Sequence, residues 1–389
     1  MKDATLCAIH PKISREGFSS LSVPAERAST ILFKSASDYM ARAARGLDGY
    51  TYGLQGTPTA RTLEAQLSAL EGGLRTVILP SGMAAATTIF LTVLMPGDTV
   101  LIPDATYQPI KDFCQNYLLP RGINHRIYPA SGEGLEALLD GSVKLIWMES
   151  PGSATMEILD VPHIVKLAKK HGILTGIDNS WATSLLFKPL KHGVDYSMQS
   201  LSKYVGGHSD ILLGSVTVND MALRQGLRDT TRYLGFGASP DDIALALRGI
   251  ETMSVRLNHV GLVAMDIATR LQNMPGVSAV LHPGLPGAVG HAIWKRDYAG
   301  AGGLFSVALP DGAAQHLDAA LVPMKIFGIG SSWGGTRSLL SPVSVKAIRE
   351  FADPIHDQTL LRIYIGLEDP ADIWTDIEGL FARISALMR

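Results

Sequence analysis

The sequence predicts an α/β protein with a mostly parallel mixed sheet, followed by a smaller α+β domain at the C-terminal end. Short apolar segments of strand length alternate with segments of helical periodicity from residue 59 to residue 252. This alternation is typical of a parallel sheet that is covered by helices on both faces. From residue 254 the pattern changes, which indicates a second domain.

The individual elements follow from apolar spacing and turn residues. In the segment 62–70, Leu63, Leu67 and Leu70 share one helical face, and two glycines end the helix. Strands are expected at 76–79, 99–102, 143–148, 173–178, 196–200 and 212–218, and further helices at 83–94, 161–171 and 241–252. Beyond them we expect a helix at 258–272, strands at 304–309 and 362–365, and a helix at 372–388.

The first 58 residues have no strong period and contain one expected short helix near residues 37–44. We interpret them as an extended arm that contacts a neighbouring subunit. The predicted organisation is an arm at 1–58, a large domain at 59–253 and a small domain at 254–389.

Composition excludes several classes of protein. The 389 residues carry a net charge of −2, so no positive field attracts nucleic acid. The two cysteines, Cys7 and Cys114, cannot build a disulfide framework. The N-terminus lacks the apolar segment of a secretory signal, and the apolar run at 83–95 is shorter than the roughly 20 residues that span a bilayer. We therefore expect a cytoplasmic enzyme with no membrane contact.

Several common sites are absent from the sequence. There is no P-loop, and the glycines at 300–303 do not have dinucleotide-binding spacing. His163 and His171 are eight residues apart on an expected helix, too far for paired metal ligands. No metal site is expected.

Three strand ends carry residues that suit chemistry, and ligands bind beyond such ends. Ser81, Gly82 and Met83 open a helix whose N-terminus suits a phosphate, although an ordinary capped turn has the same pattern. Asp178 ends a strand 25 residues before Lys203. Without a functional role, Asp178 would be an ordinary loop carboxylate and Lys203 an ordinary surface lysine. Together, a phosphate cradle, a carboxylate and a lysine beside Ser200 and Ser202 form the set that binds pyridoxal 5′-phosphate (PLP).

Longer motifs resemble a known family. They are YGLQGTPT, LEAQLSALEGG, LPSGMAAA, DATYQP, MESPGSATMEILDVP, GIDNSWAT, SLSKYVGGHSD, HPGLPG, SSWGG and LRIYIGLED. By these motifs the chain resembles the Cys/Met-metabolism PLP-dependent enzymes of fold type I, and most of all the bacterial cystathionine β-lyases. The resemblance implies PLP bound as an aldimine on Lys203 and a homotetramer, a dimer of dimers with active sites at the dimer interface.

The resemblance also implies a role for each site residue. Asp178 would pair with the pyridinium nitrogen, and Tyr107 would stack on the cofactor ring and assist catalysis. The backbone at Gly82 and Met83, with Ser200 and Ser202, would hold the phosphate, which Tyr52 of a neighbouring subunit would also reach. Ser332, Trp333 and Arg362 would bind substrate, with Arg362 on the amino-acid carboxylate.

One position departs from the family pattern. Where relatives have Tyr-x-Arg with a phosphate-binding arginine, this chain has Leu54 after Tyr52 and Gly53. The loss of one charge-assisted contact is worth roughly 1.5–3 kcal/mol. Arg61 is a candidate substitute.

The expected reaction is α,β-elimination of L-cystathionine to homocysteine, pyruvate and ammonia, in transsulfuration and methionine biosynthesis. The resemblance leaves open γ-chemistry (cystathionine γ-lyase, methionine γ-lyase or γ-synthase) and a broader cysteine-S-conjugate β-lyase or cysteine desulfhydrase. A partner-binding regulator that keeps the cofactor, and an α/β enzyme without PLP, are the alternatives from other classes.

Overall fold

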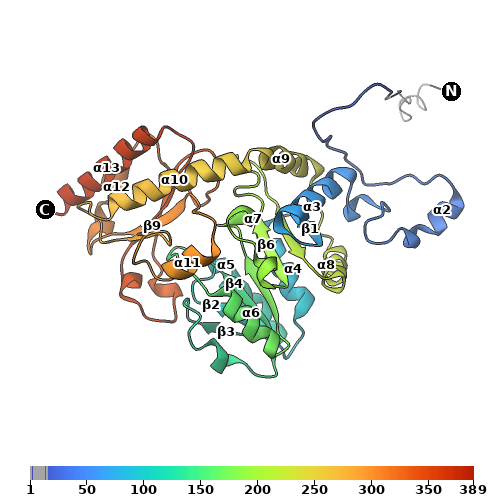
Figure 1. Cartoon of the computed structure of the whole chain (residues 1–389), viewed down its shortest axis with the longest axis horizontal. Coiled ribbons are helices and arrows are strands. Elements are labelled where there is room, and N and C mark those ends of the chain that lie inside the picture. The colour runs from blue at the N-terminus through green and yellow to red at the C-terminus, as the bar shows by residue number, and fades with distance from the viewer. Residues whose placement is uncertain (1, 3–13, 15) are drawn as a thin grey trace.

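The computed structural model describes residues 2, 14 and 16–389. Cys7 and most of the first 15 residues of the predicted arm lie outside the described residues. The described residues contain two sheets with helices around them (Figure 1). The strands of the first sheet lie within residues 75–218, and those of the second lie within residues 279–364. The expected domain boundary at residue 253 falls between these ranges and stays a prediction.

The first sheet has seven strands in the order β1-β7-β6-β5-β4-β2-β3. They are β1 (Arg75–Leu79), β2 (Thr99–Pro103), β3 (Asn124–Tyr128), β4 (Val143–Glu149), β5 (Leu174–Asp178), β6 (Tyr196–Ser200) and β7 (Gly214–Val218). β7 is antiparallel to both of its neighbours, and all other pairs are parallel. The predicted mostly parallel mixed sheet is therefore confirmed, with β3 as a strand that the sequence analysis missed.

Helices cover both faces of this sheet. They are α3 (Pro58–Glu71), α4 (Gly82–Val93), α5 (Gln108–Phe113), α6 (Val161–Lys170), α7 (Thr183–Leu186), α8 (Met221–Leu234) and α9 (Pro240–Glu251). In β4, Leu145 and Trp147 belong to one buried apolar cluster and Ile146 and Met148 to another. Successive residues thus face opposite cores, which explains the unbroken apolar run at 145–148.

The second sheet has five strands in the order β10-β11-β12-β9-β8. They are β8 (Ala279–Leu281), β9 (Leu304–Ala308), β10 (Gly328–Ile329), β11 (Leu339–Val343) and β12 (Leu360–Tyr364). The accompanying helices are α10 (Met253–Leu271), α11 (His291–Asp297), α12 (Leu317–Leu321) and α13 (Pro370–Leu387). Ile267 of α10 and Ile377 of α13 lie in one apolar cluster with Phe305 of β9, so both helices pack on this sheet.

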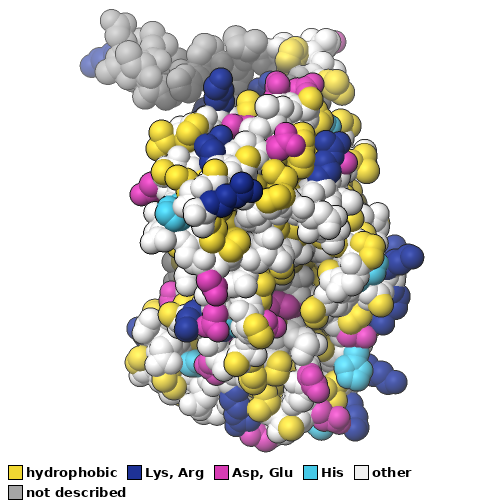
Figure 2. Space-filling view, turned by 90° about the vertical axis from the view of Figure 1, so that its left-hand side faces the viewer, with side chains coloured by type: hydrophobic (Ala, Val, Ile, Leu, Met, Phe, Trp, Pro, Cys, Tyr) yellow, Lys and Arg dark blue, Asp and Glu magenta, His cyan; other side chains and the backbone are white. Residues whose placement is uncertain are grey.

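The described part of the arm leads away from α3 and α8 (Figure 1). It contains α2 (Ala36–Met40) close to the expected helix at 37–44. Its apolar side chains are largely uncovered, and Leu32 is 88% exposed. Among the described residues, no helix combines the length and apolarity needed to cross a bilayer. On the face shown in Figure 2, acidic and basic side chains are intermixed, without a continuous basic patch.

Candidate active site

Lys203 lies in a turn directly after β6, with its side chain half-buried. Its Nζ donates a hydrogen bond to Ser332 Oγ at 2.6 Å and lies 5.2 Å from the ring centroid of Trp333. The fold thus brings a loop before β11 onto a loop after β6. Gly334 permits this approach, because its φ is +91° and an added Cβ would lie 2.8 Å from Lys203 Cα.

Burial lowers the pKa of Lys203 to about 8, with a further lowering by the Arg362 guanidinium and an opposing rise from Asp178. Arg362 lies on β12 and donates from Nη2 to the Ser331 carbonyl oxygen at 2.7 Å. Burial lowers the pKa of Arg362 as well, against a smaller opposing effect of Tyr107. These groups therefore share one electrostatic environment, where part of the Lys203 amine is neutral near pH 8.

Asp178 is the last residue of β5 and pairs in register with Glu149, the last residue of β4. Burial raises the pKa of both carboxyl groups. Among the described residues, Ser180 is the only hydrogen-bond partner of Asp178, through an N–H at 2.8 Å from Oδ1. Asp178 thus keeps capacity to accept a bond from a ligand. Glu149 was not among the residues expected at the site, although it ends a buried strand as Asp178 does.

The predicted phosphate cradle is formed by the start of α4 and the end of β6. Ser81 caps α4 by accepting the Ala84 N–H at 3.0 Å. A Cβ on Gly82 would lie 2.8 Å from Ser200 Cβ and Oγ, so the two residues are adjacent. Met83 follows in the first turn of α4. The hydroxyl of Ser202 accepts the Leu213 N–H at 3.1 Å, which anchors the lysine turn to the residue before β7.

The two tyrosines are placed differently. Tyr107 precedes α5, and its side chain is 51% exposed. Tyr52 lies on the arm, and its Oη accepts a hydrogen bond from Ser29 Oγ at 3.4 Å. In the described part of this chain no hydrogen bond joins Tyr52 to Lys203 or to the predicted cradle. Its contact with a neighbouring subunit stays a prediction.

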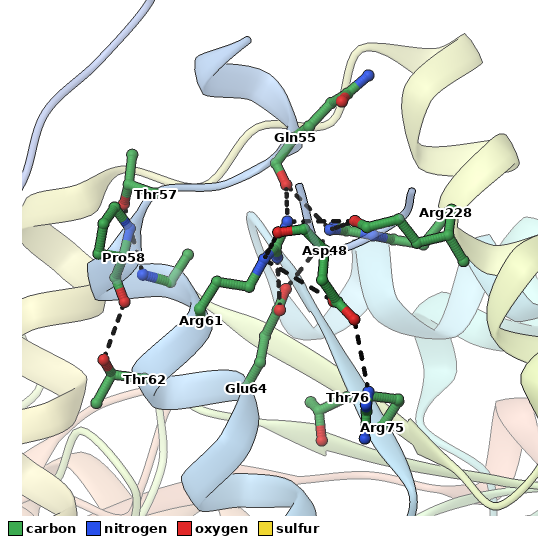
Figure 3. Close-up of polar contacts among 12 residues, drawn as sticks. Asp48, Gln55, Thr57, Pro58, Arg61, Thr62, Glu64, Arg75, Thr76 and Arg228 are labelled. Atoms are coloured by element: carbon green, nitrogen blue, oxygen red, sulfur yellow. Dashed lines mark hydrogen bonds and ion pairs between the residues drawn. The ribbon is translucent and has the colours of Figure 1, made fainter. Parts of the chain in front are cut away.

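Arg61 is engaged within its own chain, which argues against it as a substitute for the missing arginine. Its Nη1 binds Glu64 Oε2 at 2.6 Å, and its Nη2 donates to the carbonyl oxygens of Gln55 and Leu47 (Figure 3). Leu54 lines a cavity of about 510 Å³ between the arm and α8. None of the residues around Lys203 lines that cavity.

Metal-binding residues do not gather in the described part of the chain. No three His, Cys, Asp or Glu side chains lie close enough there to hold an ion. His163 and His171 are exposed, as expected for surface residues. Cys114 is buried, and burial raises the pKa of its thiol to about 12, so it is unsuited to act as a nucleophile.

The chain is similar to known proteins in both sequence and fold. The family described as Cys/Met metabolism PLP-dependent enzyme matches residues 4–382. A relative from Rhizobium johnstonii, whose assignment as a cystathionine β-lyase is provisional, is 41% identical over 94% of this chain and 92% of its own. An L-alanine/L-glutamate racemase of Wolbachia pipientis wMel is 37% identical over 95% and 94%. The crystal structure of a cystathionine γ-synthase from Xanthomonas oryzae pv. oryzae has a TM-score of 0.85 and 29% identity, covering 95% of each chain.

The residues present fit PLP. Gly82 leaves open a cradle beside Ser200 that a Cβ would fill. Asp178 has an unused acceptor, and Lys203 has a lowered pKa. Both the α/β fold type and the cofactor predicted from the motifs are confirmed, and the alternative of an α/β enzyme without PLP is wrong. The chain belongs to the Cys/Met-metabolism family of PLP-dependent enzymes.

Proposed function

We propose that this chain is a carbon–sulfur lyase that converts L-cystathionine and water to homocysteine, pyruvate and ammonia. The hydrogen bond of Lys203 with Ser332, together with the opposing effects of Arg362 and Asp178 on the pKa of Lys203, carries the proposal. A basic amine, a carboxylate and a guanidinium that would bind a carboxylate influence one another there, which supports the proposal. Bound PLP supplies the electron sink that makes the Cα proton of an amino acid acidic.

Arg362 is the residue proposed to bind the substrate. Its guanidinium is held by Ser331 and, through Nη2 at 3.2 Å, by the Ser341 hydroxyl. These contacts fix its position but use few of its five donors, so a bidentate pair with the α-carboxylate remains available. A held amino acid then presents Cα to the lysine side of the site.

Lys203 is the proposed base. As a neutral amine it takes the Cα proton, and Ser332 orients its Nζ through the 2.6 Å hydrogen bond. Asp178 would hold a proton on the pyridine nitrogen of PLP. Loss of the Cβ–S bond releases homocysteine as a thiolate, which takes a proton from the Lys203 ammonium or from Tyr107. Hydrolysis of the remaining three-carbon fragment gives pyruvate and ammonia.

A product assay tests this proposal. Lys203→Ala is expected to abolish pyruvate release from cystathionine, whereas Lys191→Ala, an exposed lysine of the same domain, should leave it unchanged. Undiminished pyruvate from Lys203→Ala would refute the assignment. Production of 2-oxobutyrate in place of pyruvate would assign γ-chemistry instead, which the similarity to a γ-synthase keeps open.

Racemisation is a second candidate, favoured by the 37% identical relative named as a racemase. The same Cα deprotonation by Lys203, followed by protonation on the opposite face, inverts an amino acid that lacks a leaving group on Cβ. Incubation with L-alanine and chiral analysis for D-alanine measures it. The cystathionine assay run in parallel shows which reaction is faster.

The assembly and location belong to the same proposal. The exposed arm with Tyr52 supports a homotetramer built from dimers, in which Tyr52 reaches the neighbour's phosphate site. Sedimentation at several concentrations would test this, because a monomer throughout would contradict it. A cytoplasmic location follows from the proposed role in amino-acid metabolism.

A further inference from the structure

Glu149 lies in the wall of the site, and the proposed function gives it no role. It ends β4, beside Asp178 at the end of β5, and is 8% exposed. A carboxylate is rarely buried unless its oxygens are hydrogen-bonded, because desolvation penalises the charge. The partners of Glu149 therefore indicate its purpose.

The hydrogen-bond partners of Glu149 lie in the segment that carries Tyr107 and in the loop that follows Glu149 itself. Oε2 accepts the Tyr107 backbone N–H at 2.7 Å and the Thr106 hydroxyl at 3.1 Å. Oε1 accepts the Ser153 hydroxyl at 2.6 Å. All three donors need an acceptor, and a carboxylate supplies one without offering a competing proton.

Little else holds Tyr107. Its ring is half exposed, and its side chain makes no cap to α5. The residues before it are anchored separately, since Asp104 binds Lys111 Nζ at 2.7 Å and the Glu350 N–H at 3.0 Å. A change at Glu149 should thus act on residues 106 and 107 and on Ser153, and leave Asp104 and its contacts in place.

We propose that Glu149 is a positioning residue, whose carboxylate fixes the backbone of Thr106 and Tyr107 so that the Tyr107 ring packs against bound PLP. The inference rests on the proposed placement of PLP beside Tyr107 and not on the identity of the substrate. This role requires the Glu149 side chain to be long enough to accept the Tyr107 N–H, and it does not require the negative charge.

Two conservative variants separate reach from charge. Glu149→Gln keeps the length and can accept the Tyr107 N–H while its amide donates to Ser153. Glu149→Asp keeps the charge but is one methylene shorter and loses the Tyr107 contact. Each is made alone and in a Tyr107→Ala background, as a double-mutant cycle. Glu157 is the control carboxylate, because it lies in the same loop and binds Thr155 instead, at 2.7 Å.

PLP affinity of the apo-protein and the visible circular dichroism of bound PLP are the measurements. Glu149→Gln and the control variants Glu157→Gln and Glu157→Asp should bind PLP within about threefold of wild type. Glu149→Asp should bind PLP about tenfold more weakly, with altered dichroism. In the Tyr107→Ala background, Glu149→Asp should have no further effect.

Three results would overturn the inference. The first is an equal loss of PLP affinity in Glu149→Gln and Glu149→Asp. The second is a loss of PLP affinity from Glu149→Asp that persists in the Tyr107→Ala background. The third is unchanged PLP binding in Tyr107→Ala. No substrate enters these measurements, so a failure of the lyase proposal is detected separately by the pyruvate assay.

Discussion

The basicity of Lys203 gives the sharpest quantitative prediction. Its pKa of about 8 results first from burial and then from the Arg362 guanidinium. At pH 7.5 a lysine of pKa 8 is roughly one quarter neutral, whereas one at its ordinary value near 10.5 is about 0.1% neutral. The site therefore provides on the order of a hundredfold more neutral amine than an exposed lysine.

The perturbation is Arg362→Gln, which removes one positive charge and keeps a side chain of similar length. The pKa of Lys203 should rise, so that less amine is neutral at pH 7.5. The assay is the rate of PLP capture by the apo-protein against pH, because only the neutral amine attacks the aldehyde carbon. The wild-type rate should level off above about pH 8, and the Arg362→Gln profile should be displaced to higher pH.

Ser341→Ala is the matched control for this experiment. It removes a neighbour of Arg362 and leaves the guanidinium in place, so its capture profile should stay near that of wild type. A wild-type profile that rises without levelling to pH 10 would refute the reasoning about burial. A profile in Arg362→Gln that coincides with wild type would refute the role of the guanidinium.

Three further predictions concern the cradle, a buried acid and the arm. Gly82→Ala should weaken PLP binding about tenfold in a cofactor titration, because its Cβ would lie 2.8 Å from Ser200, whereas Gly141→Ala, with open space around it, should not. Burial raises the pKa of Glu71 to about 7, so the folded protein binds a proton more tightly than the unfolded chain between pH 4.5 and 7. Glu71 should therefore lower the unfolding free energy across this window by up to about 3 kcal/mol, and denaturant titrations of Glu71→Gln should show a fall that is smaller by that amount. Asp48→Asn removes the counter-charge of the buried Arg224 and should cost about 1–3 kcal/mol in thermal or denaturant unfolding, with an unchanged free energy refuting the pairing.

Much of the fold was predictable because the central strands and helices have strong local patterns. The expected strand at 196–200 coincides with β6, and the expected helix at 62–70 lies within α3. β3 was missed because it is an edge strand of mixed polarity, Asn124–Tyr128, with weak period. α8 was missed because its polar face dominates its composition.

The order of the strands required the tertiary structure. β1 and β2 follow one another in the chain with only α4 between them, yet they lie on different sides of the sheet, with β7, β6, β5 and β4 between them. Sequence periodicity reports which residues are buried but not which strand is the neighbour. The antiparallel position of β7 between β1 and β6 therefore cannot be predicted from sequence periodicity.

The sequence by itself determined the kinds of residue in the site and the family, because the motifs around Lys203, Asp178 and Gly82 are local and specific. Only the tertiary structure decided which side chains meet Lys203, since Ser332 is 129 residues away and reaches it from the loop that precedes β11. The lowered pKa of Lys203 and the role inferred for Glu149 depend on burial and on contacts between distant segments. Both are properties of the folded chain, because desolvation and neighbouring charge arise only when these segments come together.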